Sequence, residues 1–475
     1  MKKLYFIIII LFSLAVSAAE KEVDQAEICV KDLDFIYEKI GQNSAPYANE
    51  LDKQFTKWYE EGYKNALSLV KKAVDVNDCY YAARYYVNGF DQPHISLRNY
   101  SKLSPEKYAG LFLAKQGDKY KIIYKNEQFK FLDEVNVGDE VTHINNLEIE
   151  KYIRRFVFPF YAENYTDKML QSAVLQALII DGNRFKPLPK NISVIRGEEK
   201  LQLDLKFTNL DPEIKKAMQA RYSLSNTNKF NVESLIDGMW IKIPSFYFNK
   251  DELIFYKGML AQLKKDLAKE DYIVFDLRGN KGGEGKYSSA IIRNLWGDKY
   301  IKSLKDKHDY NSQYTKNNRV SAGNLKQAAI YYNEKDLSLY KAKLHKEDVY
   351  FQESYNIFDY NENLYTNMDS NEFKAKIYVL TDSSCKSTCW RFVRELRQMP
   401  GVVHLGQPTF RYSQYSYAKK NRVPSERFDF FYPTKIWVKP EIKSFQPIIP
   451  HYLYKGDINQ ESEVVDWVLS VIEGV

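Results

Sequence analysis

The sequence of 475 residues lacks the features of several common functional classes. Beyond the N-terminal segment, no apolar run approaches the length of a membrane-spanning helix, so stable membrane insertion is not expected. Lysine and glutamate are interspersed instead of gathered in blocks of one sign, which is typical of a solvated surface and gives no reason to expect a nucleic-acid partner. No internal repeat is visible. The glycine-rich stretch DLRGNKGGEG also lacks the Gly-Lys-Ser/Thr ending of a phosphate-binding loop.

Cysteine is scarce, with four in the whole chain. The N-terminus has two lysines, an apolar run and a small-residue exit, which together predict a cleavable secretory signal over residues 1–18. No cysteine lies at this exit, so a lipid anchor is not expected there. We therefore expect a soluble mature protein that is periplasmic or extracellular in a bacterium. In such an oxidising compartment Cys29 and Cys79 are a plausible bridge, although two separate buried thiols are an equal alternative.

The order of the predicted elements indicates an α/β protein with additional parts. Apolar residues at helical spacing predict a helical domain over residues 26–100, and short alternating strands predict a β-rich module over 105–207. A β-α-β-α order over 233–299 and 373–475 predicts a parallel sheet covered by helices. Residues 300–372 interrupt this order with an insertion that carries the helical pattern GNLKQAAIYYNEKDLSLYKAKL, and we expect it to form a lid or cap.

Two strand-to-helix junctions are the candidate site, because ligands in α/β sheets bind beyond the carboxyl ends of the strands. In the first, DLRGNKGGEG, glycines either present backbone N–H groups to an anion or form only a tight turn. In the second, TDSSCKSTCW, short polar residues lie at a helix N-terminus, where the dipole and a backbone N–H stabilise an oxyanion. Taken alone, this second stretch favours helix capping by Ser383, Ser384 or Ser387 over a nucleophilic role.

Cys385 and Cys389 flank Ser387 and have two interpretations. Residues four apart on a helix lie about 6 Å apart, which allows a disulfide. A zinc site would need two further ligands such as His404 and His451, and the spacing supports only the one cysteine pair. We therefore expect no metal site.

Read together, four stretches resemble the tail-specific (C-terminal-processing) serine protease family, which includes the relatives of the tricorn core protease. They are GMWIKIPSF, YIVFDLRGNKGG, IYVLTDSSCKSTCW and GVVHLGQPTF. DLRGNKGG is close to the family signature Asp-Leu-Arg-x-Asn-x-Gly-Gly, and CKSTCW takes the place of its Ser-Ala-Ser-Ala-Ser-Glu segment. The resemblance implies a ClpP/crotonase-like α/β core, with Ser387 as the nucleophile. It also implies that the N–H groups of Thr388 and of Gly282 or Gly283 form the oxyanion hole. We expect Gly283 to contact the substrate as well.

The resemblance leaves two candidates for the general base. The branch of the family with a Ser-Lys pair would place its lysine at Tyr412 of this chain, so Lys419 would have to serve through a shifted loop. The tricorn-like branch uses a histidine, and His94 of FDQPHISL occupies the corresponding place. A neutral imidazole near pH 7 is suited to accept and return a proton, so we favour His94. Glu441 is the nearest carboxylate to the position of that branch's glutamate.

The stretches YAGLFL, VNVGDEVTHINN and ISVIRGEEKLQLDL resemble the PDZ-like module of the same enzymes. The resemblance implies that the backbone of Gly110, Leu111 and Phe112 receives the C-terminal carboxylate of a peptide by strand addition.

The sequence thus predicts an exported serine endopeptidase that cleaves polypeptides through an acyl-enzyme and needs no cofactor. The unusual segment DQPH, in which Gln92 and Pro93 replace the family's glycine, motivates an alternative. In that alternative the chain is an inactive member of the family that binds peptides as a scaffold.

Overall fold

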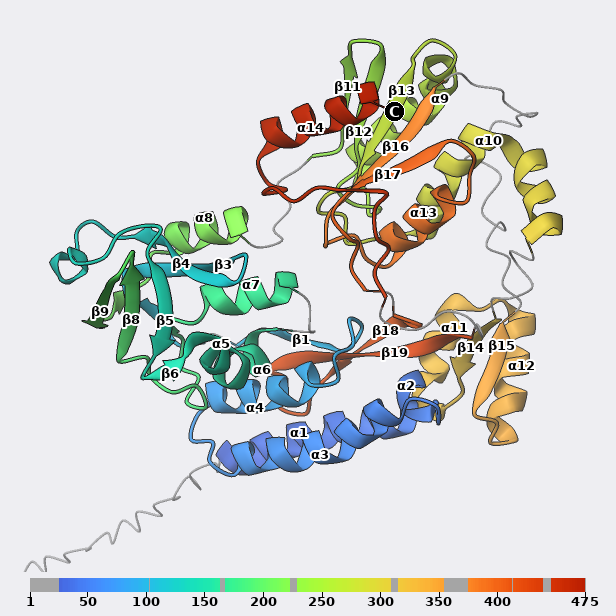
Figure 1. The fold of residues 1–475 in the computed structure, drawn as a ribbon. Coiled ribbons are helices and arrows are strands. Elements are labelled where there is room, and N and C mark those ends of the chain that lie inside the picture. The colour runs from blue at the N-terminus through green and yellow to red at the C-terminus, as the bar shows by residue number, and fades with distance from the viewer. Residues whose placement is uncertain are drawn as a thin grey trace, which may run out of the picture.

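The computed structural model describes residues 25–101, 103–162, 167–222, 229–308, 315–353, 375–411, 413–438 and 446–474. Within these ranges no helix is both long and apolar enough to cross a membrane. The predicted signal at residues 1–18 lies outside them. The described elements form four sheets and the helices that cover them (Figure 1).

The N-terminal part is helical, as its apolar spacing predicts. Its helices are α1 (Gln25–Asn43), α2 (Ala45–Ala48), α3 (Lys53–Val70) and α4 (Val76–Asn88). In α1 the fully buried side chains Leu33, Ile36 and Ile40 recur at intervals of three and four, which places them on one helix face. A disulfide between Cys29 and Cys79 joins α1 to α4 with a Cα–Cα distance of 4.9 Å. Cys29 and Cys79 are therefore bridged and are not two separate thiols.

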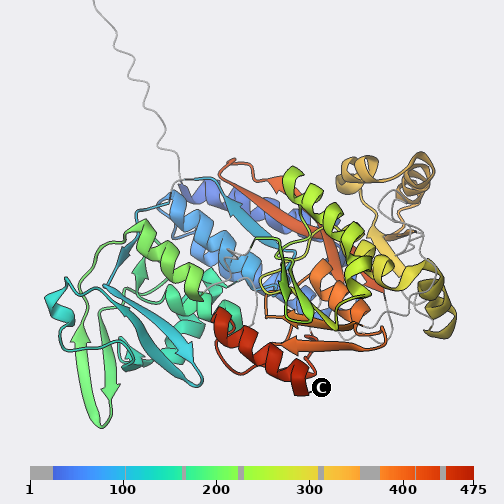
Figure 2. The same ribbon diagram turned by 90° about the horizontal axis from the view of Figure 1, so that it is seen from above.

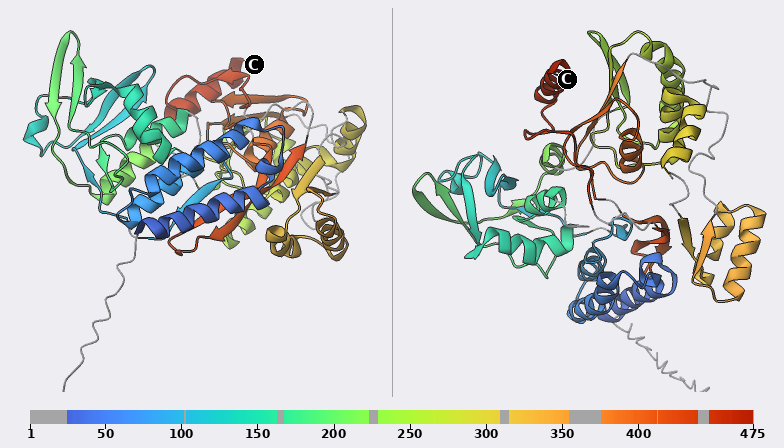
Figure 3. Two further views of the ribbon diagram at one scale, coloured as in Figure 1. Left: turned by 90° about the horizontal axis from the view of Figure 1, so that it is seen from below. Right: turned by 45° about the vertical axis from the view of Figure 1, so that its right-hand side comes forward.

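These helices pack on an antiparallel sheet built from distant parts of the chain. Its strands are β1 (Ser96–Asn99), β14 (Thr315–Arg319), β15 (Tyr350–Glu353), β18 (Tyr415–Arg422) and β19 (Phe428–Val438). The order is β1-β19-β14-β15, with β18 also paired to β19. Phe428, Phe430 and Tyr432 of β19 share one apolar cluster with the helices, and α1 and α3 lie along one side of this sheet (Figure 3). The first and last parts of the chain thus share a core.

The described part of the 300–372 insertion contributes to this sheet through β14 and β15. Its helices are α11 (Leu325–Tyr331) and α12 (Glu334–His345), preceded by a short 3₁₀ turn (Ala322–Asn324). The predicted helical pattern is therefore confirmed. A lid or cap role for the insertion stays a prediction.

Residues 107–222 form the β-rich part. A six-stranded sheet has the order β3-β4-β5-β8-β9, with β6 paired to β5, and a small sheet has the order β10-β2-β7. The strands are β2 (Lys107–Tyr108), β3 (Leu111–Gln116), β4 (Lys119–Lys125), β5 (Glu140–Ile144), β6 (Leu147–Glu148), β7 (Ile179–Ile180), β8 (Asn191–Arg196), β9 (Glu199–Asp204) and β10 (Thr208–Asn209). The helices are a 3₁₀ turn (Lys130–Leu132), α5 (Ile149–Tyr152), a π-helical turn (Ile153–Val157), α6 (Phe158–Tyr161), α7 (Asp167–Leu175) and α8 (Pro212–Tyr222). Strand β3 forms an edge of the larger sheet, and α7 packs beside it.

The remaining residues form a six-stranded sheet with the order β11-β12-β13-β16-β17-β20. Its strands are β11 (Asn231–Leu235), β12 (Gly238–Lys242), β13 (Tyr272–Asp276), β16 (Lys376–Thr381), β17 (Val402–Gly406) and β20 (Tyr452–Leu453). All pairs are parallel except β11 with β12. The helices are α9 (Lys250–Leu267), α10 (Gly285–His308), α13 (Thr388–Leu396) and α14 (Glu461–Gly474).

Both faces of this sheet are covered, which is why its central strands are continuously apolar. In β13, Ile273 and Phe275 face the cluster formed by α9, α10 and α13. Val274, between them, faces the cluster that contains Val464 and Val468 of α14. Helix α14 is seen on its own side of the sheet in Figure 2.

The structure divides the predicted core segment 373–475. Strands β16, β17 and β20 lie in the parallel sheet, whereas β18 and β19 lie in the sheet of β1. The reason is that β19 is long enough to pair with β1 at one end and β14 at the other. The chain therefore leaves the core after β17 and returns to it before β20.

Removing the Cys29–Cys79 disulfide should lower stability. The bridge spans 50 residues, so the variant Cys29→Ala/Cys79→Ala should lose about 2–4 kcal/mol of the free energy of unfolding, measured by urea titration. The matched control is Cys385→Ala/Cys389→Ala, because a bridge of sequence separation 4 restricts the unfolded chain much less. Equal urea midpoints for the wild type and the Cys29/Cys79 variant would contradict this expectation.

Candidate active site

The two predicted junctions lie side by side in the structure. Strands β13 and β16 are parallel neighbours in the core sheet, so their carboxyl ends meet at the same edge. The Leu277 N–H after β13 donates to the Leu380 carbonyl of β16 at 2.8 Å. Further along, the Lys386 N–H donates to the Asn280 carbonyl at 3.4 Å. The glycine turn and the loop before α13 are thus joined by backbone hydrogen bonds.

Asn280 organises the glycine turn, a role that the sequence alone did not reveal. Its buried amide Nδ2 donates to the Ile243 carbonyl at 2.8 Å, and its Oδ1 accepts from the Gly282 N–H at 2.8 Å. The Gly282 N–H is therefore already occupied. Gly283 has φ 144° and lies so close to the Phe246 backbone that a Cβ atom would meet its carbonyl carbon at 2.3 Å. Only glycine fits at this position.

Ser387 precedes α13 in a backbone conformation that non-glycine residues rarely adopt. Its φ is 56° and its ψ is −120°, and its side chain makes no capping hydrogen bond to α13. Such conformations cost about 1–3 kcal/mol and persist only where the surroundings impose them. Ser384, in contrast, donates its hydroxyl to Asp382 Oδ2 at 3.0 Å. Helix capping by Ser387 or Ser384, which the isolated stretch favoured, is therefore wrong, and Ser387 remains exposed.

Backbone groups of both loops converge around Ser387. A Cβ atom on Gly282 would meet the Ser387 Cβ at 2.8 Å and the Thr388 nitrogen at 2.9 Å, so these backbones are in contact. The Thr388 hydroxyl donates to the Gly283 carbonyl, which ties the first turn of α13 to the glycine turn. The Thr388 N–H belongs to the N-terminus of α13, where the helix dipole favours negative charge. An oxygen that develops charge beside Ser387 would meet this N–H group.

The cysteines beside Ser387 form a disulfide. The Cα atoms of Cys385 and Cys389 are 5.2 Å apart, and both side chains are fully buried. The disulfide excludes the zinc alternative, because no thiolate is left to bind a metal. His404 is also engaged, since its Nε2 hydrogen bonds with the Thr381 hydroxyl at 2.7 Å. Within the described ranges, no group of three His, Cys, Asp or Glu side chains could hold a metal ion.

His94 lies in the turn between α4 and β1. Burial, and secondarily the positive charge of Lys386, lower the pKa of His94 from its ordinary 6.5 to about 4. Lys386 precedes Ser387 directly, and its charge acts on His94, which indicates that the histidine turn lies near the serine loop. The His94 Nδ1 is buried and has no hydrogen-bond partner within the described part of the chain. Glu441 lies outside the described residues.

The alternative base Lys419 is directed elsewhere. Its Nζ donates to the carbonyl of Gly323 in the insertion, and burial lowers its pKa. The neighbouring Lys420 is paired with Asp429 of β19 at 2.9 Å. Tyr412, where the Ser-Lys branch would have its lysine, lies outside the described residues. The lysines near this segment thus have partners that do not belong to the serine loop.

The proposed peptide-binding residues lie at the start of β3. Gly110 has φ 75°, and a Cβ atom there would meet Phe129 at 2.3 Å. Leu111 and Phe112 begin β3, and their side chains are buried. Part of the edge of β3 is already covered, because the Lys115 N–H donates to Gln171 Oε1 of α7 at 2.9 Å.

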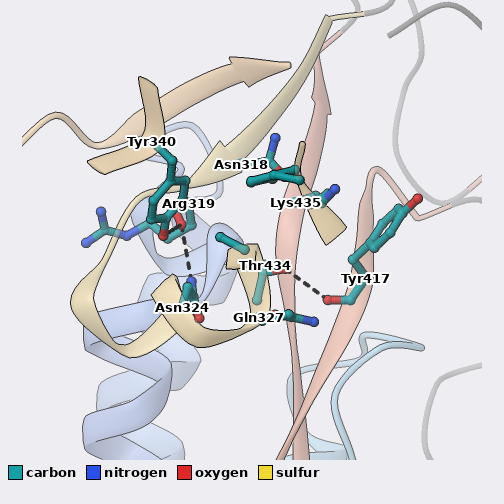
Figure 4. A pocket seen from close by; sticks show the side chains of 10 residues that line it. Asn318, Arg319, Asn324, Gln327, Tyr340, Tyr417, Thr434 and Lys435 are labelled. Atoms are coloured by element: carbon teal, nitrogen blue, oxygen red, sulfur yellow. Dashed lines mark hydrogen bonds between the residues drawn. The ribbon is translucent and has the colours of Figure 1, made fainter. Parts of the chain in front are cut away.

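A cavity of about 20 Å³ lies in a different place, between α11, α12 and the strands of the sheet that contains β19 (Figure 4). Lys435 Nζ lies 3.9 Å from the ring centroid of Tyr417 and 5.1 Å from that of Tyr332. The volume suits about one water molecule, so it does not offer a substrate pocket. None of its lining residues belongs to the loops of Ser387 or His94.

A comparison with protein-family models identifies one family for part of the chain. The description Peptidase family S41 matches residues 239–452, a range that includes both junctions. The solved structure of mature CPAF complexed with lactacystin superposes with a TM-score of 0.60 at 12% identity, covering 95% of this chain and 99% of that chain. A crystal structure of mature CPAF gives a TM-score of 0.56 at 10% identity, with coverage of 93% and 96%. These likenesses show the fold. A search of curated proteins found no match to the sequence.

The disulfide beside Ser387 should maintain the reactivity of the serine. We expect Cys385→Ala/Cys389→Ala to slow fluorophosphonate labelling of Ser387 by about tenfold, the factor that ~1.4 kcal/mol of lost positioning produces. Labelling rates are measured at 25 °C by mass spectrometry. The Cys29→Ala/Cys79→Ala variant is the control and should label at the wild-type rate. Equal rates for both variants would show that the Cys385–Cys389 bridge has no effect on the serine.

Proposed function

Because this chain belongs to peptidase family S41 and is a serine-type peptidase, we propose that it is an exported endopeptidase that uses Ser387 as its nucleophile. The observation that carries this proposal is the convergence of both junctions on one exposed serine, which is held at φ 56° between the glycine turn and the N-terminus of α13. The N-terminal apolar run with its small-residue exit supports export. We propose that the six-stranded, mostly parallel sheet is a ClpP/crotonase-like core and that residues 105–207 are a PDZ-like module.

In the proposed mechanism, Ser387 Oγ attacks the carbonyl carbon of the scissile peptide bond while His94 accepts the hydroxyl proton. The carbonyl oxygen becomes an oxyanion and accepts hydrogen bonds from backbone N–H groups. We assign this role to Thr388 and Gly283, because the Gly282 N–H donates to Asn280. This assignment revises the sequence-based preference for Gly282.

The tetrahedral intermediate then collapses, and the C–N bond breaks as His94 returns the proton to the leaving amine. This leaves an acyl-enzyme on Ser387. Water, deprotonated by His94, attacks the ester carbonyl, and Ser387 leaves with a proton from the histidine. These steps need no cofactor, because protons pass only among Ser387, His94, water and the substrate.

His94 must keep one ring orientation through these steps. An acceptor for its Nδ1–H would hold the imidazole and stabilise the imidazolium that forms. We propose Glu441 as this acceptor, since it is the carboxylate that the resemblance indicates. We also propose that the backbone of Gly110, Leu111 and Phe112 receives the substrate carboxylate at the edge of β3.

Substitution of Ser387 tests the proposed function. The purified mature protein should be labelled by a fluorophosphonate and should hydrolyse casein, and Ser387→Ala should abolish both. His94→Ala should lower kcat/KM by about 10²–10⁴-fold, the usual contribution of a general base. Ser384→Ala is the matched control and should retain activity, because its hydroxyl is bonded to Asp382. A folded wild type without labelling or turnover would favour the scaffold alternative.

The lowered pKa of His94 predicts an unusual pH profile. Because its pKa is lowered, the imidazole of His94 stays neutral, and so can accept a proton, until the pH falls to about 4. The acidic limb of kcat/KM reports the base of the free enzyme, so we expect activity to persist below pH 6 and to fall only near the lower value. The measurement is kcat/KM on a fluorogenic peptide from about pH 3.5 to about pH 8, a range that contains both pKa values. A limb at the ordinary value of 6.5 would contradict this prediction.

A further inference from the structure

The proposed base and nucleophile belong to different layers of the molecule. Ser387 lies at the edge of the parallel core sheet, whereas His94 lies between α4 and β1, in the layer formed by the N-terminal helices and the sheet of β19. Figure 1 shows these layers as the upper and lower parts of the molecule. The relative position of Oγ and imidazole therefore depends on contacts between the layers, and not on either loop alone.

The segment that follows β17 is fixed to the core on the side of Ser387. The Phe410 N–H donates to the Cys385 carbonyl at 3.1 Å, and Lys386 Nζ lies 5.5 Å from the centroid of the Phe410 ring. One residue earlier, the Thr409 N–H donates to the Ile448 carbonyl at 3.1 Å, and its hydroxyl accepts from the Ile448 N–H at 2.9 Å. Phe410 thus moves with the serine loop.

The next residues of the same segment hold the histidine turn. Arg411 Nη2 donates to Asp91 Oδ1 at 2.5 Å, and the Ser413 hydroxyl donates to Gln92 Oε1 at 3.0 Å. Gln92 is buried, and the side chains of Arg411 and Asp91 are only 22% and 16% exposed, so the ion pair is shielded from most of the solvent. Shielded charge-assisted hydrogen bonds are stronger than exposed ones.

The turn itself needs such support. Asp91 has φ 52°, a left-handed conformation that aspartate adopts at a cost, and its N–H donates to the Asn88 carbonyl at the end of α4. The turn closes with the Ile95 N–H bonded to the Gln92 carbonyl at 3.0 Å. His94 lies inside this closed turn, three residues after the carboxylate that Arg411 holds.

We propose that Arg411 is a positioning residue, which holds the His94 turn at a fixed distance from Ser387 through its ion pair with Asp91. This inference rests on the proposed function. Phe410 and Arg411 are adjacent, so one short segment contacts the nucleophile loop with one residue and the base turn with the next. Arginine suits this role because its charge is permanent and its planar group has several donors.

Arg411→Ala should lower kcat far more than it changes KM. Displacing a catalytic base by about 1 Å lowers the reaction rate by up to about 10²-fold. We therefore expect kcat on the fluorogenic peptide to fall by about 10–100-fold. The charged groups next to the turn are Lys386 from the serine loop, Asp91 on the turn and Arg411. A loosened turn admits water to His94, so the acidic limb of kcat/KM should move upward towards 6.5, the ordinary pKa of histidine. Arg411→Lys should restore part of kcat.

The matched control is Arg196→Ala. Arg196 pairs with Asp139 at 2.7 Å in the β-rich sheet, so its loss removes a comparable ion pair away from the site. It should leave kcat and the pH profile at wild-type values. A double-mutant cycle gives a second test: Asp91→Ala should resemble Arg411→Ala, and the double variant should be no slower than either, because the two residues act through one contact.

The inference is overturned if Arg411→Ala keeps the kcat and acidic limb of Arg196→Ala, or if the losses of Asp91→Ala and Arg411→Ala add. If Arg411→Ala does not fold by circular dichroism, Asp91→Asn and Arg411→Lys provide the same comparison with smaller changes. Failure of the proposed function can be told apart from failure of this inference, because the wild type itself would then show no Ser387-dependent labelling.

Discussion

The parallel pairing of β13 with β16 is the constraint on which the rest of the site depends. It places two strand-to-helix loops at one edge of the sheet, although they are separated by more than one hundred residues in sequence, including the insertion. One loop supplies glycines that allow close backbone approach, and the other supplies a helix N-terminus with a serine before it. Neither loop has both features. The proposed nucleophile and the proposed oxyanion donors lie together only because these strands are neighbours.

The conformation of Ser387 shows how the surroundings impose this geometry. A serine with φ 56° lies in a region that costs energy, and three sets of contacts hold it there. The backbone of Gly282 packs against it, the Thr388 hydroxyl ties the helix turn to Gly283, and the buried Cys385–Cys389 disulfide closes the loop around it. The conformation leaves the hydroxyl exposed and frees it from capping α13. The strained backbone therefore presents the hydroxyl of the proposed nucleophile.

Much of this arrangement is predictable from the sequence, because it follows from local patterns. Apolar strands that run into DLRGNKGG and TDSSCKSTCW indicate parallel strands with loops at one edge, and the resemblance identifies Ser387 among three candidate serines. The stretch TDSSCKSTCW taken alone favoured helix capping by Ser387, which the structure does not show. Capping depends on φ and ψ values, which composition does not reveal. The bond from the Gly282 N–H to the Asn280 side chain, which favours Gly283 in the proposed oxyanion hole, is also absent from local patterns.

Contacts between distant segments could not be predicted from local sequence patterns. The Arg411–Asp91 pair joins residues 320 apart, and nothing local to either residue indicates the other. The exit of β18 and β19 from the core to pair with β1 is of the same kind, since an apolar strand does not specify its neighbour. The proposed pairing of His94 with Ser387 depends on such long-range contacts, which is why the sequence alone does not determine it.

The central claim is that His94 and Ser387 act as one catalytic unit across two layers of the fold. A peptidyl chloromethyl ketone tests it directly, because its carbonyl adds a serine hydroxyl while a histidine nitrogen held within reach displaces its chloride. Mass spectrometry of the inhibited enzyme should locate the alkyl adduct on His94, and its formation should slow strongly in Ser387→Ala. An adduct on a lysine such as Lys419, or alkylation of His94 at an unchanged rate without Ser387, would contradict the account.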